Sequence, residues 1–357
     1  MRNNIHPDQI CLFDPTKDRR IIERERERDR RLGHIYQDII SIENLLISYQ
    51  EFLRGKRKRK DVAKFSLYLM DNIITLHQDL KEKKYKHGPY HAFKINDPKP
   101  RDIHKATVRD RILHHAIYRI LYPYFDKKFI FDSYSCRNDK GTHRAMNRFQ
   151  SMARKVSRNN TRTAWVLKGD IRKFFATIDH RVLKAILRRH IEDKNIFWLL
   201  DEIINSFHIE NGTNVGLPLG NVTSQLLVNI YMNEFDQFLK RKLKVKYCVR
   251  YADDFVILSE NKEYLENLIT QIAAFLKTNL GLLLNEKKVC IQQFSSGVDF
   301  LGWVHFPHHR VLRTTTKRRM FMRLKQNHTE ETVASYLGLL KHGNTYKLVK
   351  SITKGKL

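Results

Sequence analysis

The sequence predicts an α+β fold for this chain of 357 residues. Segments with apolar residues every three or four positions are interspersed with short β-rich runs, without regular strand–helix–strand alternation. The clearest strand signal lies at residues 247–258, where two runs rich in Tyr, Val, Phe and Ile flank Asp253 and Asp254. Because only about two residues separate the runs, they predict a β-hairpin with two carboxylates at its tip.

The N-terminal part is predicted to be helical and strongly basic. Residues 1–32 are expected to be peripheral, because the alternating acidic and Arg residues at 23–31 are typical of a solvated helix face; a contact to RNA or protein is the alternative. Apolar residues recur with helical period over 35–53 and again over 62–80. Between them, residues 55–60 (Gly-Lys-Arg-Lys-Arg-Lys) favour a phosphate-contacting loop over a nuclear signal.

Residues 90–103 predict two short strands around an Asp-Pro turn. Lys94, Lys99 and Arg101 lie on this second hairpin. A strand at 164–170 follows further along the chain and ends in a carboxylate.

Further helices are predicted from apolar spacing at 112–121, 182–191, 227–238, 265–276 and 333–340. The first of these is expected to end near Pro123, because proline disrupts a helix interior.

The charge balance predicts a polyanionic partner. The chain has 67 Lys and Arg against 38 Asp and Glu, a formal net charge of +29, which points to nucleic acid; an anionic membrane surface is the competing partner. The longest uncharged stretch, 211–233, is too polar to span a bilayer, so we expect no membrane association. No apolar run follows the first residues, so no signal peptide is expected.

The cysteines favour a cytoplasmic location. The four of them, Cys11, Cys136, Cys248 and Cys290, are scattered without a Cys-x-x-Cys motif, which suits a reducing compartment and argues against a zinc finger. None of the 17 His residues has acid or Cys partners at convincing zinc spacing.

Asp170 ends a predicted strand, whereas Asp253 and Asp254 form the predicted hairpin tip. If both elements lie in one sheet, the three carboxylates can converge at its end. Such an oxygen-rich set suits two Mg²⁺ ions that would assist phosphoryl transfer. The alternative is an ordinary acidic turn without a metal.

Local motifs in order from about Lys94 to Trp303 resemble a reverse transcriptase. The motifs are Asp170 with Phe174-Phe175, Tyr251-Ala-Asp-Asp254, Leu283-Leu-Asn-Glu-Lys-Lys288 and Val298-Asp-Phe-Leu-Gly-Trp303. The resemblance implies a right-hand polymerase with an antiparallel palm sheet. Its parts would be a charged N-terminal extension (1–32), fingers (33–160), a palm (161–304) and a short helical thumb (305–357).

The resemblance also implies roles for individual residues. Metal ligands would be Asp170, Asp253, Asp254 and the Ile171 carbonyl, the three acids being catalytic. Nucleotide contacts would come from Lys94, Arg101, Phe175, Leu219, Gly220, Gln225 and Lys288. Template or primer contacts would come from Arg137, Tyr251, Leu301, Gly302 and Trp303.

Several of these roles have alternatives. Lys94 and Arg101 would grip the triphosphate by charge-assisted hydrogen bonds, or contact phosphates generally. The ring of Phe175 would exclude a 2′-hydroxyl and so favour dNTPs, or it is a core side chain. Lys288 would neutralise or protonate the leaving pyrophosphate, with Lys287 as the ambiguous neighbour.

The loop Leu217-Pro-Leu-Gly-Asn-Val-Thr-Ser-Gln225 departs from most reverse transcriptases, including group II intron enzymes. Those carry Gln before the Gly and Pro after the Ser, whereas this chain has Leu219 and Gln225. The pair resembles enzymes of diversity-generating retroelements, as does the closing segment 335–344. That resemblance implies cDNA synthesis from a template-repeat RNA, errors at adenines for mutagenic retrohoming, and a small basic accessory protein as partner.

A physical argument supports the importance of Leu219. A Gln can hydrogen-bond the incoming sugar, whereas Leu219 cannot; losing a contact of about 1 kcal/mol lowers discrimination between correct and incorrect geometry. Alternatively, Leu219 only packs beneath the pocket. Other functions left open are a group II intron-like or antiphage-defence reverse transcriptase and a catalytically idle RNA-binding protein, the latter disfavoured by the intact acids.

Overall fold

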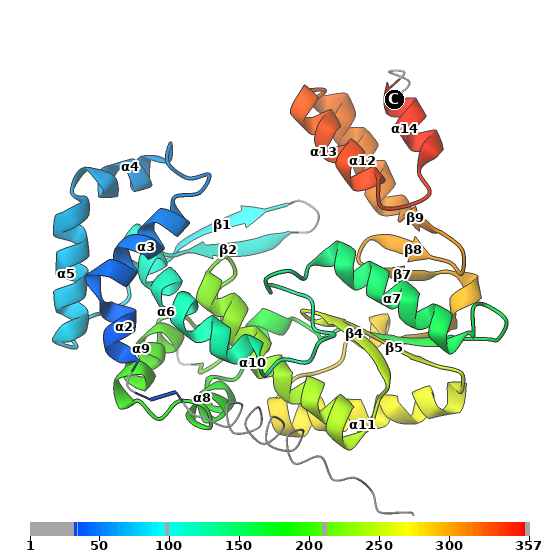
Figure 1. Ribbon diagram of the computed structural model, residues 1–357, viewed down its shortest axis with the longest axis horizontal. Helices are drawn as coiled ribbons and strands as arrows, with labels where there is room; N and C mark the ends of the chain where they lie inside the picture. The colour runs from blue at the N-terminus through cyan, green and yellow to red at the C-terminus, as the bar shows by residue number, and fades with distance from the viewer. Residues whose placement is uncertain (1–31, 34, 97–99, 209–212, 354–357) are drawn as a thin grey trace, which may run out of the picture.

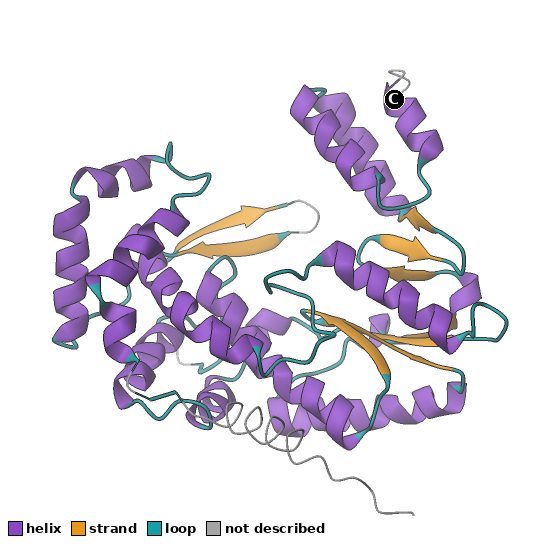
Figure 2. Cartoon of the chain, viewed as in Figure 1, coloured by secondary structure: helices purple, strands orange, loops and turns teal. Residues whose placement is uncertain are grey.

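The computed structural model describes residues 32–33, 35–96, 100–208 and 213–353. The charge run at 23–31 and Lys99 lie outside these residues. Helices and short antiparallel sheets are mixed along the chain, which confirms the predicted α+β class (Figures 1 and 2). None of the helices that the structure describes combines the length and hydrophobicity needed to cross a membrane.

Each of the first two predicted helices is divided in two. Helices α2 (Tyr36–Ile40) and α3 (Ile42–Phe52) meet at Ser41, whose extended backbone breaks the helix and whose hydroxyl accepts a hydrogen bond from the Asn44 N–H. Ser is a favoured N-cap, so it starts a new helix instead of continuing the old one. Helices α4 (Lys60–Leu67) and α5 (Leu69–Lys81) are divided at Tyr68, whose backbone is not helical and whose side chain makes no capping hydrogen bond.

The next helix ends near the predicted position. Helix α6 (Val108–Asp126) runs through Pro123 and ends three residues beyond it. Proline at this position removes one backbone donor, but the buried Tyr122 and Phe125 on either side keep the last turn packed against the core.

The predicted N-terminal hairpin is present. Strands β1 (His91–Ile95) and β2 (Arg101–Lys105) pair antiparallel, with Lys94 opposite Asp102. The backbone N–H of His104 donates to the Leu219 carbonyl, which ties the base of the hairpin to the loop before α10 (Val222–Gln237).

The central sheet has four antiparallel strands in the order β4-β5-β3-β6. Strands β4 (Tyr247–Tyr251) and β5 (Asp254–Ser259) form the predicted acidic hairpin, and β3 (Trp165–Gly169) is the predicted strand before Asp170. Strand β6 (Cys290–Gln293) completes the sheet beside β3 and was not predicted.

Helices cover both faces of this sheet. Helix α7 (Thr142–Val156), which apolar spacing did not reveal, packs on one face against Val256 and Leu258 of β5. Phe255 and Ile257 point to the opposite face, as the two-residue period of a strand requires, and join the core of α10 and α11 (Lys262–Leu280). The remaining helices in this part are α8 (His180–Arg188), α9 (Lys194–Asn205), the π-helix η2 (Phe238–Lys242) and the 3-10 helices η1 (Phe174–Thr177), η3 (Glu286–Lys288) and η4 (Phe294–Ser296).

The C-terminal part combines a small sheet with three helices. Strands β7 (Val298–Phe300), β8 (Trp303–His305) and β9 (Arg310–Leu312) are antiparallel neighbours. Helices α12 (Thr314–Gln326), α13 (Glu330–Leu340) and α14 (Tyr346–Thr353) stand beyond them (Figure 1).

The part boundaries at 160 and 304 remain predictions. Elements pack across both of them: α7 precedes 160 but covers the central sheet, and β9 follows 304 but pairs with β8.

Candidate active site

Three carboxylates meet at one end of the central sheet. In the β3–β5 pairing Gly169 lies opposite Phe255, so Asp170 after β3 and Asp254 at the start of β5 reach the same edge. Asp253 precedes Asp254 in a tight turn with Ala252, whose φ is +55°. The structure therefore brings together the three acids that the sequence singled out.

The carboxylates affect one another electrostatically. Burial raises the pKa of Asp254 to about 6, aided by repulsion from Asp253 and Asp170 and by a side-chain hydrogen bond with Asp170. The pKa of Asp253 is raised as well, first by burial and then by Asp170, while Lys288 and Arg101 oppose the shift. Two of the predicted phosphate-binding cations thus lie within electrostatic reach of the acids.

Asp170 is held by the segment that follows α11. Its two carboxylate oxygens accept hydrogen bonds from Asn285 Nδ2 at 3.0 Å and from Lys288 Nζ at 2.6 Å. The Asn285 backbone N–H donates to the Asp170 carbonyl, and the adjacent Ile171 pairs with Leu284 in an isolated antiparallel bridge. Lys288, and not its neighbour at 287, makes the bond to the acid.

Sequence reasoning missed the ion pair that supports the acidic turn. The Arg250 guanidinium is buried and donates to both carboxylate oxygens of buried Asp236, at 2.7 and 2.6 Å. Its Nη1 donates to the Ala252 carbonyl at 3.0 Å, and its Nη2 also donates to the Ser133 hydroxyl at 2.9 Å. Arg250 therefore fixes the residue immediately before Asp253; a charged residue within an otherwise apolar strand was the available signal.

Asn285 and Lys168 were also missed. The positive charge of Lys168 lowers the pKa of Asp254, opposing the effect of burial, and its Nζ donates to the Asp299 carbonyl at 2.7 Å. A Lys in the middle of a buried strand was the signal for this residue.

The donor set fits hard divalent cations. Among the described residues, no group of three or more His, Cys, Asp or Glu side chains is arranged so that it could hold a metal ion as it stands. Asp170, Asp253 and Asp254 nevertheless offer only oxygen donors, and their mutual repulsion is what a cation would relieve. In this structure the Lys288 ammonium supplies positive charge to that cluster.

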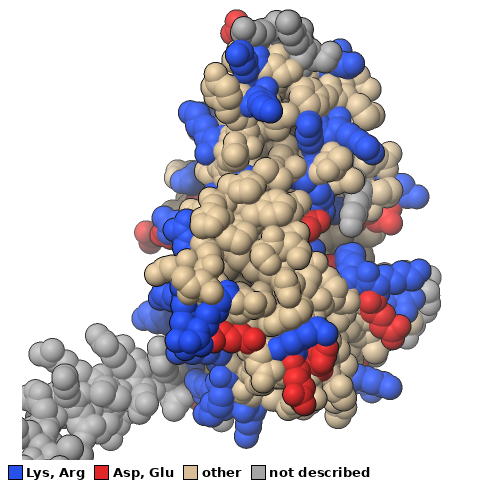
Figure 3. Space-filling model, turned by 90° about the vertical axis from the view of Figure 1, so that its right-hand side faces the viewer, with Lys and Arg blue, Asp and Glu red and all other residues tan. Residues whose placement is uncertain are grey.

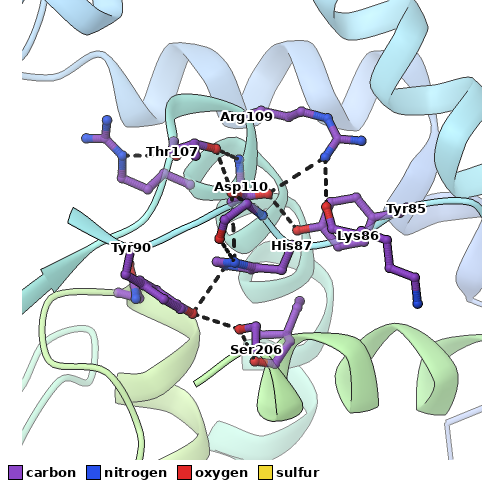
Figure 4. A network of polar contacts seen from close by, with 12 residues as sticks. Tyr85, Lys86, His87, Tyr90, Thr107, Arg109, Asp110 and Ser206 are labelled. Atoms are coloured by element: carbon purple, nitrogen blue, oxygen red, sulfur yellow. Dashed lines mark hydrogen bonds and ion pairs between the residues drawn. The ribbon is translucent and has the colours of Figure 1, made fainter. Parts of the chain in front are cut away.

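The β1–β2 hairpin carries Lys94 and Arg101, and both side chains are exposed. Its base is fixed by a buried network around Asp110, shown in Figure 4. Asp110 accepts hydrogen bonds from the Tyr85 hydroxyl at 2.8 Å and the Thr107 hydroxyl at 2.5 Å. Because these two residues precede β1 and follow β2, the network anchors both ends of the hairpin.

The other predicted nucleotide contacts lie outside the β1–β2 hairpin. Phe175 is half-buried, and its ring packs edge-on against Phe174 with centroids 5.5 Å apart. Leu219 is half-buried against the hairpin base, and Gly220 follows it with a φ of +113°, a conformation that favours glycine. Gln225 lines a pocket of about 280 Å³ between the N-terminal helices, the hairpin and α10.

Two of the predicted template or primer contacts have internal roles. Arg137 donates to Asp126 Oδ1 at 2.6 Å and to the Ile130 and Ser133 carbonyls, so its guanidinium is already engaged within the protein. Trp303 is 1% exposed in the C-terminal core, which corrects the expectation that its side chain contacts a primer.

The remaining three predicted contacts, Tyr251, Leu301 and Gly302, lie at turns or beside them. The Tyr251 hydroxyl accepts a hydrogen bond from the Thr142 hydroxyl at 3.2 Å. Leu301 and Gly302 form the turn between β7 and β8 with φ values of +51° and +86°. A primer contact by these residues stays a prediction.

Adding a methyl group at Gly169 is expected to disturb the acidic edge. A Cβ there would lie 2.2 Å from the Phe255 ring, which is buried against Phe235. We expect Gly169→Ala to cost about 1–3 kcal/mol in urea unfolding, because a packed core must shift, and to lower polymerase activity.

Gly338→Ala on α13 is the matched control, because its Cβ would meet nothing within 4 Å. A second substitution, Phe255→Leu, should recover part of the stability lost in Gly169→Ala. Equal stability of Gly169→Ala and Gly338→Ala would show that this contact does not constrain the edge.

Comparisons with known proteins show which sequences this chain is similar to. The family model "Reverse transcriptase (RNA-dependent DNA polymerase)" matches residues 91–305. "Protein YkfC" of Escherichia coli is 30% identical over 274 residues, covering 66% of this chain and 70% of that protein.

Two intron-encoded proteins are also similar. "Group II intron-encoded protein LtrA" of Lactococcus lactis is 25% identical over 70% of this chain, and "Putative COX1/OXI3 intron 2 protein" of Saccharomyces cerevisiae is 24% identical over 73%. This chain spans 51% and 38% of their lengths. Among solved structures, apo telomerase from Candida tropicalis matches with a TM-score of 0.45 and 14% identity, over 70% of this chain and 59% of that one.

Proposed function

This chain belongs to the reverse transcriptase family, the RNA-dependent DNA polymerases, and from that premise we propose that it copies a template RNA into cDNA at Asp170, Asp253 and Asp254. The convergence of these acids at one sheet edge is the observation that carries the proposal. The basic composition of the chain suits both the template and the product.

The three acids would hold two Mg²⁺ ions, with the Ile171 carbonyl as a further ligand. Bound there, the ions would supply charge stabilisation for nucleotidyl transfer to the primer end. Two cations of the protein would bind the phosphates of the nucleotide. Arg101 projects from the hairpin to bind the dNTP triphosphate. Lys288 is held beside Asp170, where it neutralises the leaving pyrophosphate.

We further propose that the enzyme is of the diversity-generating retroelement type and is error-prone at template adenines. Leu219 and Gln225 support this assignment, because the loop 217–225 that holds them resembles that of diversity-generating retroelement enzymes. A small basic accessory protein and a cytoplasmic location belong to the same proposal. The alternatives are a group II intron-like enzyme, which the similarity to intron-encoded proteins favours, and an antiphage-defence enzyme.

Leu219→Gln is expected to raise fidelity. A Gln at this position can hydrogen-bond the incoming sugar, and a contact of about 1 kcal/mol corresponds to roughly a fivefold fall in misincorporation. The measurement is sequencing of cDNA made by both proteins on one RNA template, with errors counted separately opposite each template base.

Leu67→Gln is the control, because Leu67 is 78% exposed on α4. Its error spectrum should match that of the unmodified chain. If Leu219→Gln shares that spectrum too, Leu219 has no role in fidelity. Errors spread evenly over the template bases would favour an intron-like or defence enzyme.

A further inference from the structure

A polar groove lies on the far side of α7 from the central sheet. It has a volume of about 640 Å³ and runs between the exposed face of α7, the loop and strand around β9, and the turn between α13 and α14. We call it the α7–β9 groove. Its charged lining residues are Arg154, Lys155 and Arg310, and none of the described acidic side chains lines it.

The walls of the α7–β9 groove are fixed by hydrogen bonds. Gln150 of α7 donates to the Phe306 and Pro307 carbonyls at 2.8 and 3.1 Å. Arg310 donates to Asn147 Oδ1 at 2.9 Å, and its own carbonyl accepts from the Asn344 N–H at 2.8 Å. The groove is thus preorganised and does not need to form when a ligand arrives.

The two cations on the helix are available for a ligand. Arg154 and Lys155 are exposed and make no ion pair within the described part of the chain. By contrast, Arg158 and Arg162, which follow α7, both lie within 4 Å of Glu260. Figure 3 shows the molecule from the right-hand side of Figure 1, where clusters of Lys and Arg side chains lie on the surface.

We propose that the α7–β9 groove binds the phosphodiester backbone of a structured RNA outside the polymerase active site. Cations contact phosphates, and uncharged amides and hydroxyls such as Asn147, Asn159 and Ser151 can hydrogen-bond 2′-hydroxyl groups. The buried face of α7 packs on the central sheet, so the groove is separated from Asp170 by the helix itself. This RNA site goes beyond the proposed function, because it would hold RNA that is not being copied.

The test is RNA binding by the double variant Arg154→Ala/Lys155→Ala. The probe is a fluorescein-labelled RNA hairpin followed by fluorescence anisotropy at several salt concentrations. We expect about tenfold weaker binding and a salt slope smaller by about 2, because two phosphate contacts are lost. Extension of a short primer–template should stay within about twofold of the unmodified enzyme, since those contacts are remote from the acids.

Arg158→Ala/Arg162→Ala is the matched control, because it removes the same charge from neighbouring positions already paired with Glu260. It should change hairpin binding by less than about twofold. Equal loss in both double variants would overturn the proposal, as would a DNA hairpin that binds as tightly as the RNA one. The binding assay needs no polymerisation, so a failure of the proposed polymerase function would be recognised separately.

Discussion

Asp254→Asn is expected to lower RNA-templated DNA synthesis by at least about 10³-fold while the protein stays folded. The amide keeps the size of the side chain but removes a negative charge that metal binding requires. At neutral pH the ionised Asp254 is held among Asp253 and Asp170 at a raised pKa. Removing its charge relieves that repulsion, so the thermal midpoint of the metal-free variant should stay equal or rise.

The control is Asp71→Asn, a substitution of an exposed acid on α5. It should leave primer extension unchanged. Loss of activity together with loss of folding in Asp254→Asn would show that the carboxylate is structural. Retained activity would exclude it from catalysis.

Asp236→Ala is expected to destabilise the protein by about 3–5 kcal/mol, because it leaves the buried Arg250 guanidinium without its carboxylate. Urea unfolding measures this change. Activity should fall too, since Arg250 also holds the Ala252 carbonyl immediately before Asp253.

The double variant Arg250→Met/Asp236→Leu separates stability from positioning. Apolar residues of similar volume should recover much of the lost stability, because neither buried charge remains. Polymerase activity should remain low, since no side chain then donates to the Ala252 carbonyl. A change below about 1 kcal/mol in Asp236→Ala would mean that the ion pair contributes little to the fold.

The sequence predicted those parts of the fold that depend on local patterns. The β4–β5 hairpin and β3 have strong strand-forming runs, so the convergence of Asp170 with Asp253 and Asp254 could be anticipated. Helix α7 was missed because its buried stripe uses small or flexible residues such as Ala145 and Met152, set among many Arg and Lys residues.

Features imposed by tertiary packing could not be predicted. Strand β6 has the sequence Cys-Ile-Gln-Gln, and its pairing with β3 makes it a strand. The partners of Arg250 come from α10 and from the loop after α6, which no local pattern connects. Trp303 ends a motif that resembles a primer-contacting segment, but the C-terminal helices bury it.

The most direct measurement of the central claim is Mg²⁺-dependent incorporation of dNTPs by the purified chain on an RNA template with an annealed primer. We predict extension by the unmodified chain that stops on chelation of the metal, and none by Asp170→Asn, Asp253→Asn or Asp254→Asn. Extension that persists in these variants, or a well-folded unmodified chain that binds RNA but incorporates no nucleotide, would contradict the assignment of the three acids as a polymerase active site.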